Sequence, residues 1–164
     1  MPLRSAHAEP HGISVVLVHP EIPPNTGNIG RLCAATCTPL HLIEPLGFSL
    51  EDRYLRRAGL DYWPYLELKT HPSWRDYDDS APAATRVHFS AHAHATFLDA
   101  PLADDRLELV FGCETKGLPT EVARDAGDRI YRIPISQPAV RSLNLANAVA
   151  IVLYEALRRR QQLL

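Results

Sequence analysis

ISVVLVHPEIPPNTGNIGRLCAATCTPLHLIE, residues 13–44, is the most informative stretch for the class of fold. It begins with a β-branched apolar run (13–18), continues with helical spacing of apolar residues (26–37) and ends with a second apolar run (40–44). A strand, a helix and a strand in this order place the two strands parallel in one sheet. The stretch therefore predicts an α/β crossover unit.

The same alternation continues along the rest of the chain, without an internal repeat, a low-complexity segment or a dividing linker. We therefore predict an α/β fold with a mostly parallel sheet flanked by helices on both faces. It would form a single domain at residues 13–164, behind a flexible N-terminal tail at residues 1–12. The further predicted strands are 87–91, 107–112 and 129–134, with a weaker one at 66–70, and the further predicted helices are 51–58, 72–78, 119–126 and 142–161.

The composition limits the class of protein. The 164 residues are 46% hydrophobic, enough to bury a core, and the formal net charge of −2 argues against a protein that coats nucleic acid through a large positive excess. Cys33, Cys37 and Cys113 are odd in number and lie in apolar surroundings, which favours reduced, buried thiols. No apolar run approaches the roughly 20 residues of a membrane span, and we expect a cytoplasmic protein with no membrane segment.

The predicted helix at 26–37 contains an arginine one turn inside it. Asn25 is well placed to cap this helix, and the two prolines before it hold the entry segment extended. Asn25, Asn28 and Arg31 would then lie at the carboxyl end of a strand, where α/β proteins bind ligands. The alternative is a capped helix whose arginine faces solvent.

FGCETKGLP, residues 111–119, is the second informative segment and directly follows a predicted strand. Gly112 and Gly117 allow close backbone approach, Glu114 offers a carboxylate, and Pro119 suits the first turn of a helix. The loop is not a phosphate-binding P-loop, because its second glycine is not followed by Lys and Ser or Thr. It is either a ligand-binding loop or a plain turn between a strand and a helix.

The third segment, IPISQPAVRSLNLANAVAIVLYEALRRR, covers residues 133–160. Its helical part has one apolar face, yet the first turn contains Ser142, Asn144 and Asn147. Ser142 as a cap explains one of these residues, whereas unpaired amides beside an apolar face are costly. A loop with proline and small polar groups at a helix start can hold a ligand.

Together the three segments resemble the knotted SPOUT class of RNA methyltransferases, and most closely its small tRNA 2′-O-methyltransferases that modify the wobble nucleotide. The motifs PEIPPNTGNIGRLCA, IEPLGF, RRAGLDYW, FGCETKGLP and RSLNLANAVAIVLYEA occur in the family's order and at suitable spacing, from about residue 13 to residue 158. The resemblance implies a C-terminal trefoil knot, a rare exception to ordinary chain topology. It also implies S-adenosylmethionine-dependent 2′-O-methylation of tRNA nucleotide 34, a cytidine or modified uridine.

The resemblance further implies the partners and the site residues. The partners are the tRNA anticodon stem-loop and a second copy of the chain, with the first and last helices packed across the interface. The family's motif residues around the reaction centre correspond to Asn25, Arg31, Glu114, Ser142 and Asn144. The cofactor contacts correspond to Ser90, in the segment SAHAHA, and to Gly112, Ile133 and Ser142.

The chemistry implied for these residues needs no metal, because the methyl group is transferred from a sulfonium. The ribose 2′-hydroxyl is a poor nucleophile at neutral pH, so the site must stabilise developing charge on its oxygen. Arg31 fits that electrostatic role, since a guanidinium stays protonated and is not a simple base. Glu114 could orient Arg31, and Asn25 and Asn144 could fix the ribose or neighbouring loops.

His88, His92 and His94 resemble a metal-ligand cluster by their spacing. On a strand the same spacing lines one face, and we interpret the three residues in that way rather than as a metal site.

Two arginine clusters are candidate RNA contacts. Arg53, Arg56 and Arg57 lie beside Tyr54, and a second cluster spans residues 158–160. Each is as readily a solvated helix face.

Two other functions remain open from the sequence. One is methylation of a different tRNA or rRNA nucleotide, and the other is a catalytically silent RNA-binding protein with the same fold. A silent protein would be expected to have lost Arg31 or the region around Asn144, and both are present.

Overall fold

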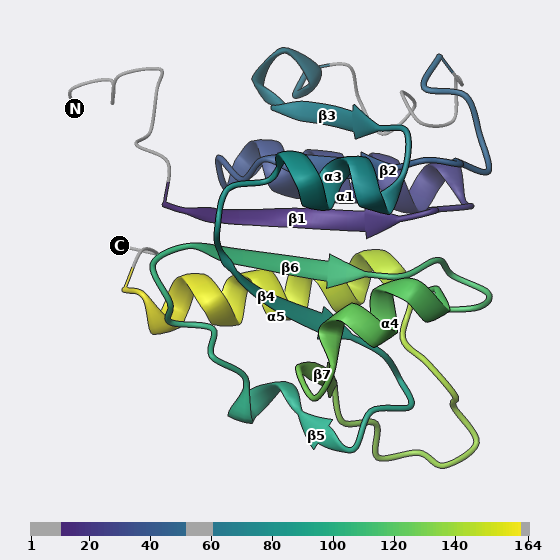
Figure 1. The fold of residues 1–164 in the computed structure, drawn as a ribbon, viewed down its shortest axis with the longest axis vertical. Coiled ribbons are helices and arrows are strands. Elements are labelled where there is room, and N and C mark those ends of the chain that lie inside the picture. Colours follow the sequence, from purple (N-terminus) through teal and green to yellow (C-terminus); the bar gives the residue numbers. More distant parts are fainter. Residues whose placement is uncertain (1–10, 52–60, 162–164) are drawn as a thin grey trace.

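A computed structural model describes residues 11–51 and 61–161 of the chain (Figure 1). Within these ranges a sheet of seven strands has the order β3-β2-β1-β6-β4-β7-β5, and each neighbouring pair is parallel. The strands are β1 (Ile13–Val18), β2 (Leu40–Ile43), β3 (Leu68–His71), β4 (Thr85–Phe89), β5 (Ala95–Thr96), β6 (Leu107–Phe111) and β7 (Ile130–Arg132). The α-helices are α1 (Pro23–Ala35), α3 (Trp74–Ser80), α4 (Thr120–Ala126) and α5 (Leu145–Arg159), and short 3-10 helices are η1 (Trp63–Tyr65) and η2 (Phe97–Asp99).

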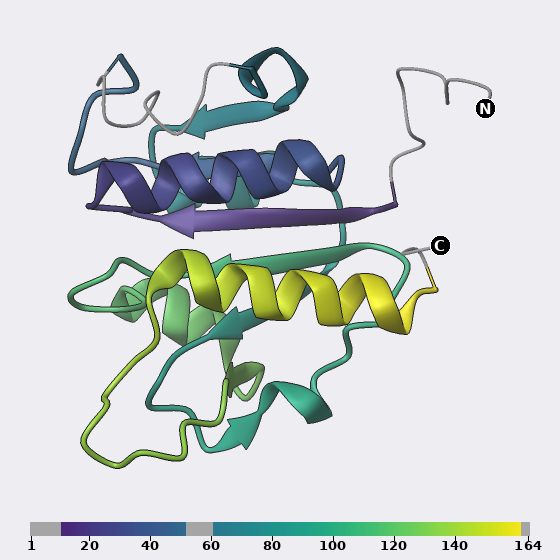
Figure 2. The same ribbon diagram turned by 180° about the vertical axis from the view of Figure 1, so that it is seen from behind.

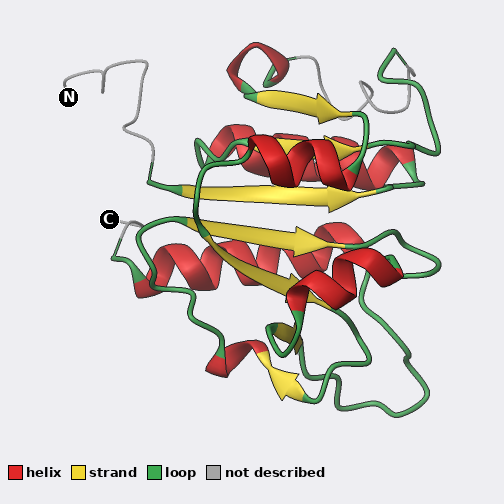
Figure 3. Ribbon diagram, viewed as in Figure 1, coloured by secondary structure: helices red, strands yellow, loops and turns green. Residues whose placement is uncertain are grey.

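The helices cover both faces of the sheet. Figure 1 shows α3 and α4 in front of the strands, and Figure 2, seen from the opposite side, shows α1 and α5 side by side on the other face of the sheet. The colouring by element in Figure 3 makes the three layers visible, with the strands between the two helical layers. This arrangement confirms the predicted α/β class and the predicted parallel sheet.

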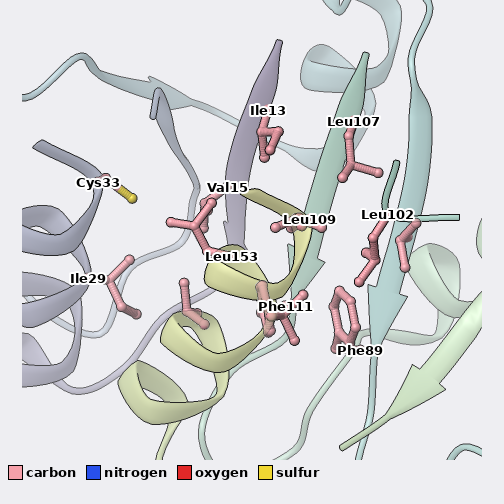
Figure 4. Packing of buried hydrophobic residues seen from close by; sticks show 14 of the residues in the cluster. Ile13, Val15, Ile29, Cys33, Phe89, Leu102, Leu107, Leu109, Phe111 and Leu153 are labelled. Carbon is pink, nitrogen blue, oxygen red and sulfur yellow. The ribbon is translucent and has the colours of Figure 1, made fainter. Parts of the chain in front are cut away.

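The core has a cluster on each side of the sheet because both faces are covered. Val15 and Leu17 of β1 face α1 and α5, and the alternate residues Val16 and Val18 face α3 and α4. Figure 4 shows how Leu153 of α5 lies among apolar side chains of α1, β1 and β6. This burial on both faces explains why the strand sequences are almost continuously apolar.

The first helix begins earlier than predicted, and its expected cap is wrong. α1 starts at Pro23 instead of residue 26, and Ile22 occupies the N-cap position without a side-chain cap of its own. Proline is tolerated in the first turn because a backbone N–H there would have no hydrogen-bond partner within the helix. Asn25 is consequently inside the first turn, and it is 7% exposed.

The last helix begins later than predicted, at Leu145 rather than at residue 142. Its cap is Asn144, whose Oδ1 accepts hydrogen bonds from the backbone N–H groups of Ala146 and Asn147 at 2.9 and 3.3 Å. The predicted cap at Ser142 is therefore wrong. Asparagine and serine are both good N-cap residues, so residue type alone did not distinguish Ser142 from Asn144 as the cap.

Several smaller boundaries also differ from the prediction. β4 ends at Phe89 rather than at residue 91, β7 covers only part of 129–134, and the two-residue edge strand β5 was not predicted. Cys37 is exposed rather than buried, because it follows the end of α1 with a φ of 53°, as at many helix C-termini. Most of the predicted helix 51–58 lies outside the described residues.

The domain boundaries and the knot stay predictions. Of the predicted tail, residues 11 and 12 are described, and the His11 ring Nε2 lies 2.8 Å from the carbonyl oxygen of Thr36. In the part of the chain that the structure describes, no helix is both long and apolar enough to cross a bilayer.

His88 of β4 gives a testable pH dependence of stability. Its side chain is 1% exposed, and burial lowers its pKa to about 4 from the ordinary histidine value of 6.5. The unfolded chain therefore binds more protons between these two pKa values, and stability is lost as the pH falls through this window. We expect the contribution of His88 to the free energy of unfolding to be about 2 kcal/mol lower at pH 5 than at pH 8.

Urea unfolding of the wild type and of His88→Gln at both pH values measures this effect. The variant should lack that part of the pH dependence, while all other titrating groups act equally in both proteins. An identical pH dependence in the two proteins would contradict the assignment.

Candidate active site

A large pocket lies at the carboxyl ends of the central strands. It has a volume of about 1050 Å³ and is lined by the loops that follow β4 (90–95) and β6 (112–118) and by the segment between β7 and α5 (133–144). Ligands bind at this edge in open α/β sheets, because loops from several parallel strands converge there. The pocket therefore lies where the sequence predicted a ligand site.

The floor of the pocket is apolar. Phe89 and Phe111, at the ends of the neighbouring strands β4 and β6, stack with ring centroids 4.8 Å apart and an interplanar angle of 17°. Ile133, from the segment before α5, and Leu145, the first residue of α5, are further apolar residues of the pocket lining. An apolar floor with polar groups at the rim is typical of a pocket for an organic ligand.

The structure brings together all but one of the predicted site residues. Arg31 is the exception, since it is not among the residues that line the pocket. The predicted residues that line it are Asn25, Ser90, Gly112, Glu114, Ile133, Ser142 and Asn144.

The loop after β6 is closed tightly on itself. The backbone groups of Cys113 and Gly117 exchange two hydrogen bonds, of 3.1 and 3.0 Å, and Gly117 has a φ of 68°. A Cβ atom on Gly112 would lie 2.1 Å from the carbonyl carbon of Gly117. Glycine is therefore required at residue 112, because a side chain there would force the loop open.

Glu114, at the tip of this loop, binds the start of α1. Its Oε2 accepts a hydrogen bond from the backbone N–H of Glu21 at 2.8 Å, and its Oε1 accepts one from the backbone N–H of Ile22 at 3.1 Å. Asn25 Nδ2 donates to the same Oε1 at 3.3 Å. The carboxylate thus caps a helix that has no cap from its own sequence, and a negative charge is favourable at that end.

A reciprocal contact strengthens this junction. The Glu21 carboxylate accepts hydrogen bonds from the backbone N–H and the hydroxyl of Thr115, at 3.1 and 2.9 Å. The two glutamates therefore join the loop 112–118 to the entry of α1 from both sides.

Asn25 connects this junction to the last helix. Asn144 Nδ2 donates a hydrogen bond of 2.9 Å to Asn25 Oδ1. Glu114, Asn25 and Asn144 thus form one hydrogen-bonded chain at the pocket, with one residue from each of the three informative sequence segments. The Asn144 amide, which looked costly in the sequence, is paired here.

Arg31 lies outside this chain of contacts. It is six residues after Asn25 in α1, about 9 Å further along the helix axis at the usual rise. Its guanidinium forms an ion pair with Asp61 at 3.4 Å and lies 5.2 Å from the centre of the Tyr62 ring. Our expectation that Glu114 orients Arg31 is therefore wrong within this chain.

The histidines do not form the single strand face that was expected. His88 is buried in β4, whereas His92 and His94 lie beyond its end, are exposed and line the pocket. The described residues contain no group of three or more side chains suited to hold a metal ion.

The C-terminal arginines have structural contacts. Arg158 binds Glu155, Arg159 binds Glu155 and the carbonyl oxygens of residues 98 and 100, and Arg160 donates to the carbonyl of Asp105. They lie at the C-terminal end of α5, whereas the pocket is lined by residues at its N-terminal end. The other cluster, Arg53 to Arg57, falls outside the described residues.

Comparison with known proteins identifies the family. The model of the SpoU rRNA methylase family matches residues 12–154, which is most of the chain. The chain belongs to the SpoU rRNA methylase family. The SpoU assignment agrees with the SPOUT resemblance of the three motif segments.

Similar SpoU proteins have been named or solved. The tRNA (cytidine(34)-2'-O)-methyltransferase of Burkholderia ambifaria is 47% identical over 149 residues, which is 89% of this chain and 94% of that protein. A structure described as "Structural insights into the 2-OH methylation of C/U34 on tRNA" has a TM-score of 0.86 and 45% identity, and the match covers 93% of this chain and 99% of that one. The SpoU methyltransferase AviRb from Streptomyces viridochromogenes, in complex with AdoMet, has a TM-score of 0.79 and 25% identity, over 95% of this chain and 60% of that one.

Three residues that contact the predicted site residues or their loops were not identified from the sequence. Glu21 pairs with Thr115, and Asp61 and Tyr62 contact Arg31. A signal for the last two was available, because Gly27 and Gly30 in the middle of a helix indicate that another group packs closely there.

Proposed function

We propose that the protein transfers a methyl group from S-adenosylmethionine to the ribose 2′-hydroxyl of nucleotide 34, a cytidine or modified uridine, in the anticodon stem-loop of tRNA. The observation that supports this most is the hydrogen-bonded chain of Glu114, Asn25 and Asn144 at the pocket, which unites the three motif segments. The SpoU family and the names of its similar members support the same reaction. The free thiols suit the reducing cytoplasm.

The pocket fits S-adenosylmethionine by its shape and chemistry. The stacked rings of Phe89 and Phe111 offer an apolar surface, and the tight loop 112–118 lines the pocket next to it. Ser90, Gly112, Ile133 and Ser142 are the proposed cofactor contacts. When bound there, S-adenosylmethionine would supply an electrophilic methyl group on a sulfonium.

The remaining proposed roles belong to the protein's own side chains. Asn25, Asn144 and Ser142 would orient the ribose at the mouth of the pocket, and Glu114 would hold Asn25 in place. Arg31 would stabilise negative charge that develops on the 2′-oxygen as its proton passes, by way of a substrate phosphate, to water. Such preorganised charge acts more strongly in a site from which water is excluded.

We also propose that the active form is a homodimer. Arg31 does not line the pocket of its own chain, and in the proposed dimer the second copy would present its Arg31 there. A surface suited to such a contact lies on α5, where Asn147, Ile151 and Tyr154 are exposed along one side of the helix. Light scattering at micromolar concentration should give twice the mass of the chain, and a monomer that is active would contradict the proposal.

A pair of synthetic stem-loops tests the reaction. One has ribose at nucleotide 34, and its matched control has 2′-deoxyribose at that nucleotide only. Transfer of labelled methyl from S-adenosylmethionine to the first and not to the second is the expected result. Equal transfer to both would indicate another nucleotide, and transfer to neither by a folded, tRNA-binding protein would support a silent RNA-binding protein.

A further inference from the structure

Two glycines leave part of one side of α1 without side chains. Gly27 and Gly30 lie in its middle, where glycine is less favourable than alanine, so a packing reason is expected. The structure gives that reason. A Cβ atom on Gly30 would lie 3.2 Å from Leu66 Cδ2 and 3.6 Å from Tyr62 Cε2, so the Tyr62 ring lies directly against the helix.

A hydrogen bond from the Tyr62 hydroxyl adds to the packing that holds the ring against this side of α1. The hydroxyl donates a hydrogen bond of 2.9 Å to the carbonyl oxygen of Gly27, and the residue is only 8% exposed. In a regular helix the same carbonyl accepts from the N–H of Arg31, four residues on. The ring and the backbone of Arg31 are therefore tied to the same turn of α1.

The Arg31 side chain covers this ring. Gly27, Gly30 and Arg31 have the spacing i, i+3 and i+4, so they lie on one side of the helix. The guanidinium carbon lies 5.2 Å from the ring centre, within the range of a cation–π contact, and Asp61 Oδ1 is 3.4 Å from Arg31 Nη2. The Arg31 side chain still has 51% of its surface exposed, so its outer edge remains accessible to a ligand.

We propose that Tyr62, assisted by Asp61, is a positioning residue that holds the Arg31 guanidinium ready for the substrate. The inference rests on the proposed function, in which Arg31 acts on the ribose oxygen. An arginine side chain surrounded by solvent samples many rotamers, and ordering it for the reaction costs conformational entropy. A fixed aromatic ring on one side of the guanidinium lowers that entropy cost, and preorganised groups act more strongly in catalysis. Asp61 contributes less, because exposed ion pairs are weak.

A double-mutant cycle tests this coupling. Tyr62→Leu removes the aromatic face, and we expect it to lower the single-turnover methylation rate at saturating tRNA by about tenfold, the scale of a well-formed cation–π contact. In an Arg31→Ala background the same substitution should change the rate by less than about twofold. Tyr65→Leu is the matched control, since Tyr65 is three residues away, is 72% exposed and should leave the rate unchanged.

Conservative variants keep the test decisive if Tyr62→Leu does not fold. Tyr62→Phe retains the ring and should retain most of the rate. Asp61→Asn should lower the rate by about threefold, in the range of exposed charge pairs, and only when Arg31 is present. Glu67→Gln is its control, because Glu67 pairs with Lys69 at 3.0 Å at similar exposure and should have no effect.

A measurement without RNA separates this inference from the proposed function. Ring-current shifts of the Arg31 side-chain protons should appear in NMR spectra of the wild type, persist in Tyr62→Phe and vanish in Tyr62→Leu. If these shifts are present but the wild type methylates no RNA, the proposed function fails while the contact stands. Equal rate losses from Tyr62→Leu in the wild-type and Arg31→Ala backgrounds, or missing ring-current shifts, would overturn the positioning role.

Discussion

Arg31→Ala is expected to lower the rate of methyl transfer by about two to three orders of magnitude, the scale of losing one preorganised partner of a developing oxyanion. The affinity for S-adenosylmethionine should barely change, because the proposed role of Arg31 is toward the ribose oxygen of the tRNA and Arg31 is not among the proposed cofactor contacts. Single-turnover methylation at saturating tRNA gives the rate, and calorimetry gives the cofactor affinity. Arg31→Lys should recover only part of the rate, since an ammonium lacks the planar fork of a guanidinium.

The alternative is an arginine with no role beyond the surface of α1. It predicts a nearly normal rate and a change of at most about 0.5 kcal/mol in the free energy of unfolding, as for most surface substitutions. A wild-type rate in Arg31→Ala would mean that the start of α1 serves the architecture only.

Mixing two inactive variants locates the chain in which Arg31 acts. Gly112→Val keeps Arg31 but forces the pocket loop open, because a Cβ atom on residue 112 would meet the backbone of Gly117 at 2.1 Å. A mixed dimer contains one Gly112→Val chain and one Arg31→Ala chain. The pocket of the Arg31→Ala chain is intact and can receive Arg31 from the Gly112→Val chain. Random exchange of subunits should restore about a quarter of the wild-type activity in a two-fold symmetric dimer. No recovery would place Arg31 in the pocket of its own chain.

Glu114→Gln is expected to lower the free energy of unfolding by about 3 kcal/mol, because hydrogen bonds to a charged group are lost and a helix start loses its cap. The three groups that face the carboxylate are all donors, namely the backbone N–H groups of Glu21 and Ile22 and the Asn25 amide. A glutamine has one oxygen and directs its NH₂ group at one or more of these donors. Activity should fall as well, since Asn25 loses its support at the pocket.

Urea unfolding compares this variant with a matched control. Glu21→Gln alters the neighbouring carboxylate, whose partners are the exposed backbone N–H and hydroxyl of Thr115, and should cost less than about 1 kcal/mol. Hydrogen exchange at the amides of Glu21 and Ile22 should accelerate in Glu114→Gln alone. Equal stability of the two variants would show that Glu114 does not cap α1.

The class of fold and the location of the site could be predicted from the sequence because both depend on local patterns. The apolar runs have the length and composition of strands, and parallel strands bring their carboxyl ends to one edge. That reasoning placed Asn25 at this edge, and the family resemblance added Glu114 and Asn144 to the same site. The local patterns also gave the parallel sheet, whose strands are buried on both faces.

The details that were wrong depend on contacts between distant residues. The cap of α1 comes from Glu114, far along the chain, and no local pattern predicts it. Tyr62 lies on Gly27 and Gly30 of α1, and only the folded chain brings that ring to Arg31. Serine and asparagine have similar preferences for the N-cap position, so local sequence did not show which of Ser142 and Asn144 caps α5. In the folded chain the cap is Asn144, which also donates a hydrogen bond to Asn25.

Nucleoside mapping by mass spectrometry tests the proposed reaction most directly. Unmodified tRNA is incubated with the protein and S-adenosylmethionine, digested, and analysed for the position and identity of each methylated nucleoside. We predict a single new 2′-O-methylated cytidine or uridine at nucleotide 34, and its absence when the Arg31→Ala variant replaces the wild type. Methylation at any other nucleotide, or on a base rather than a ribose, would contradict the account.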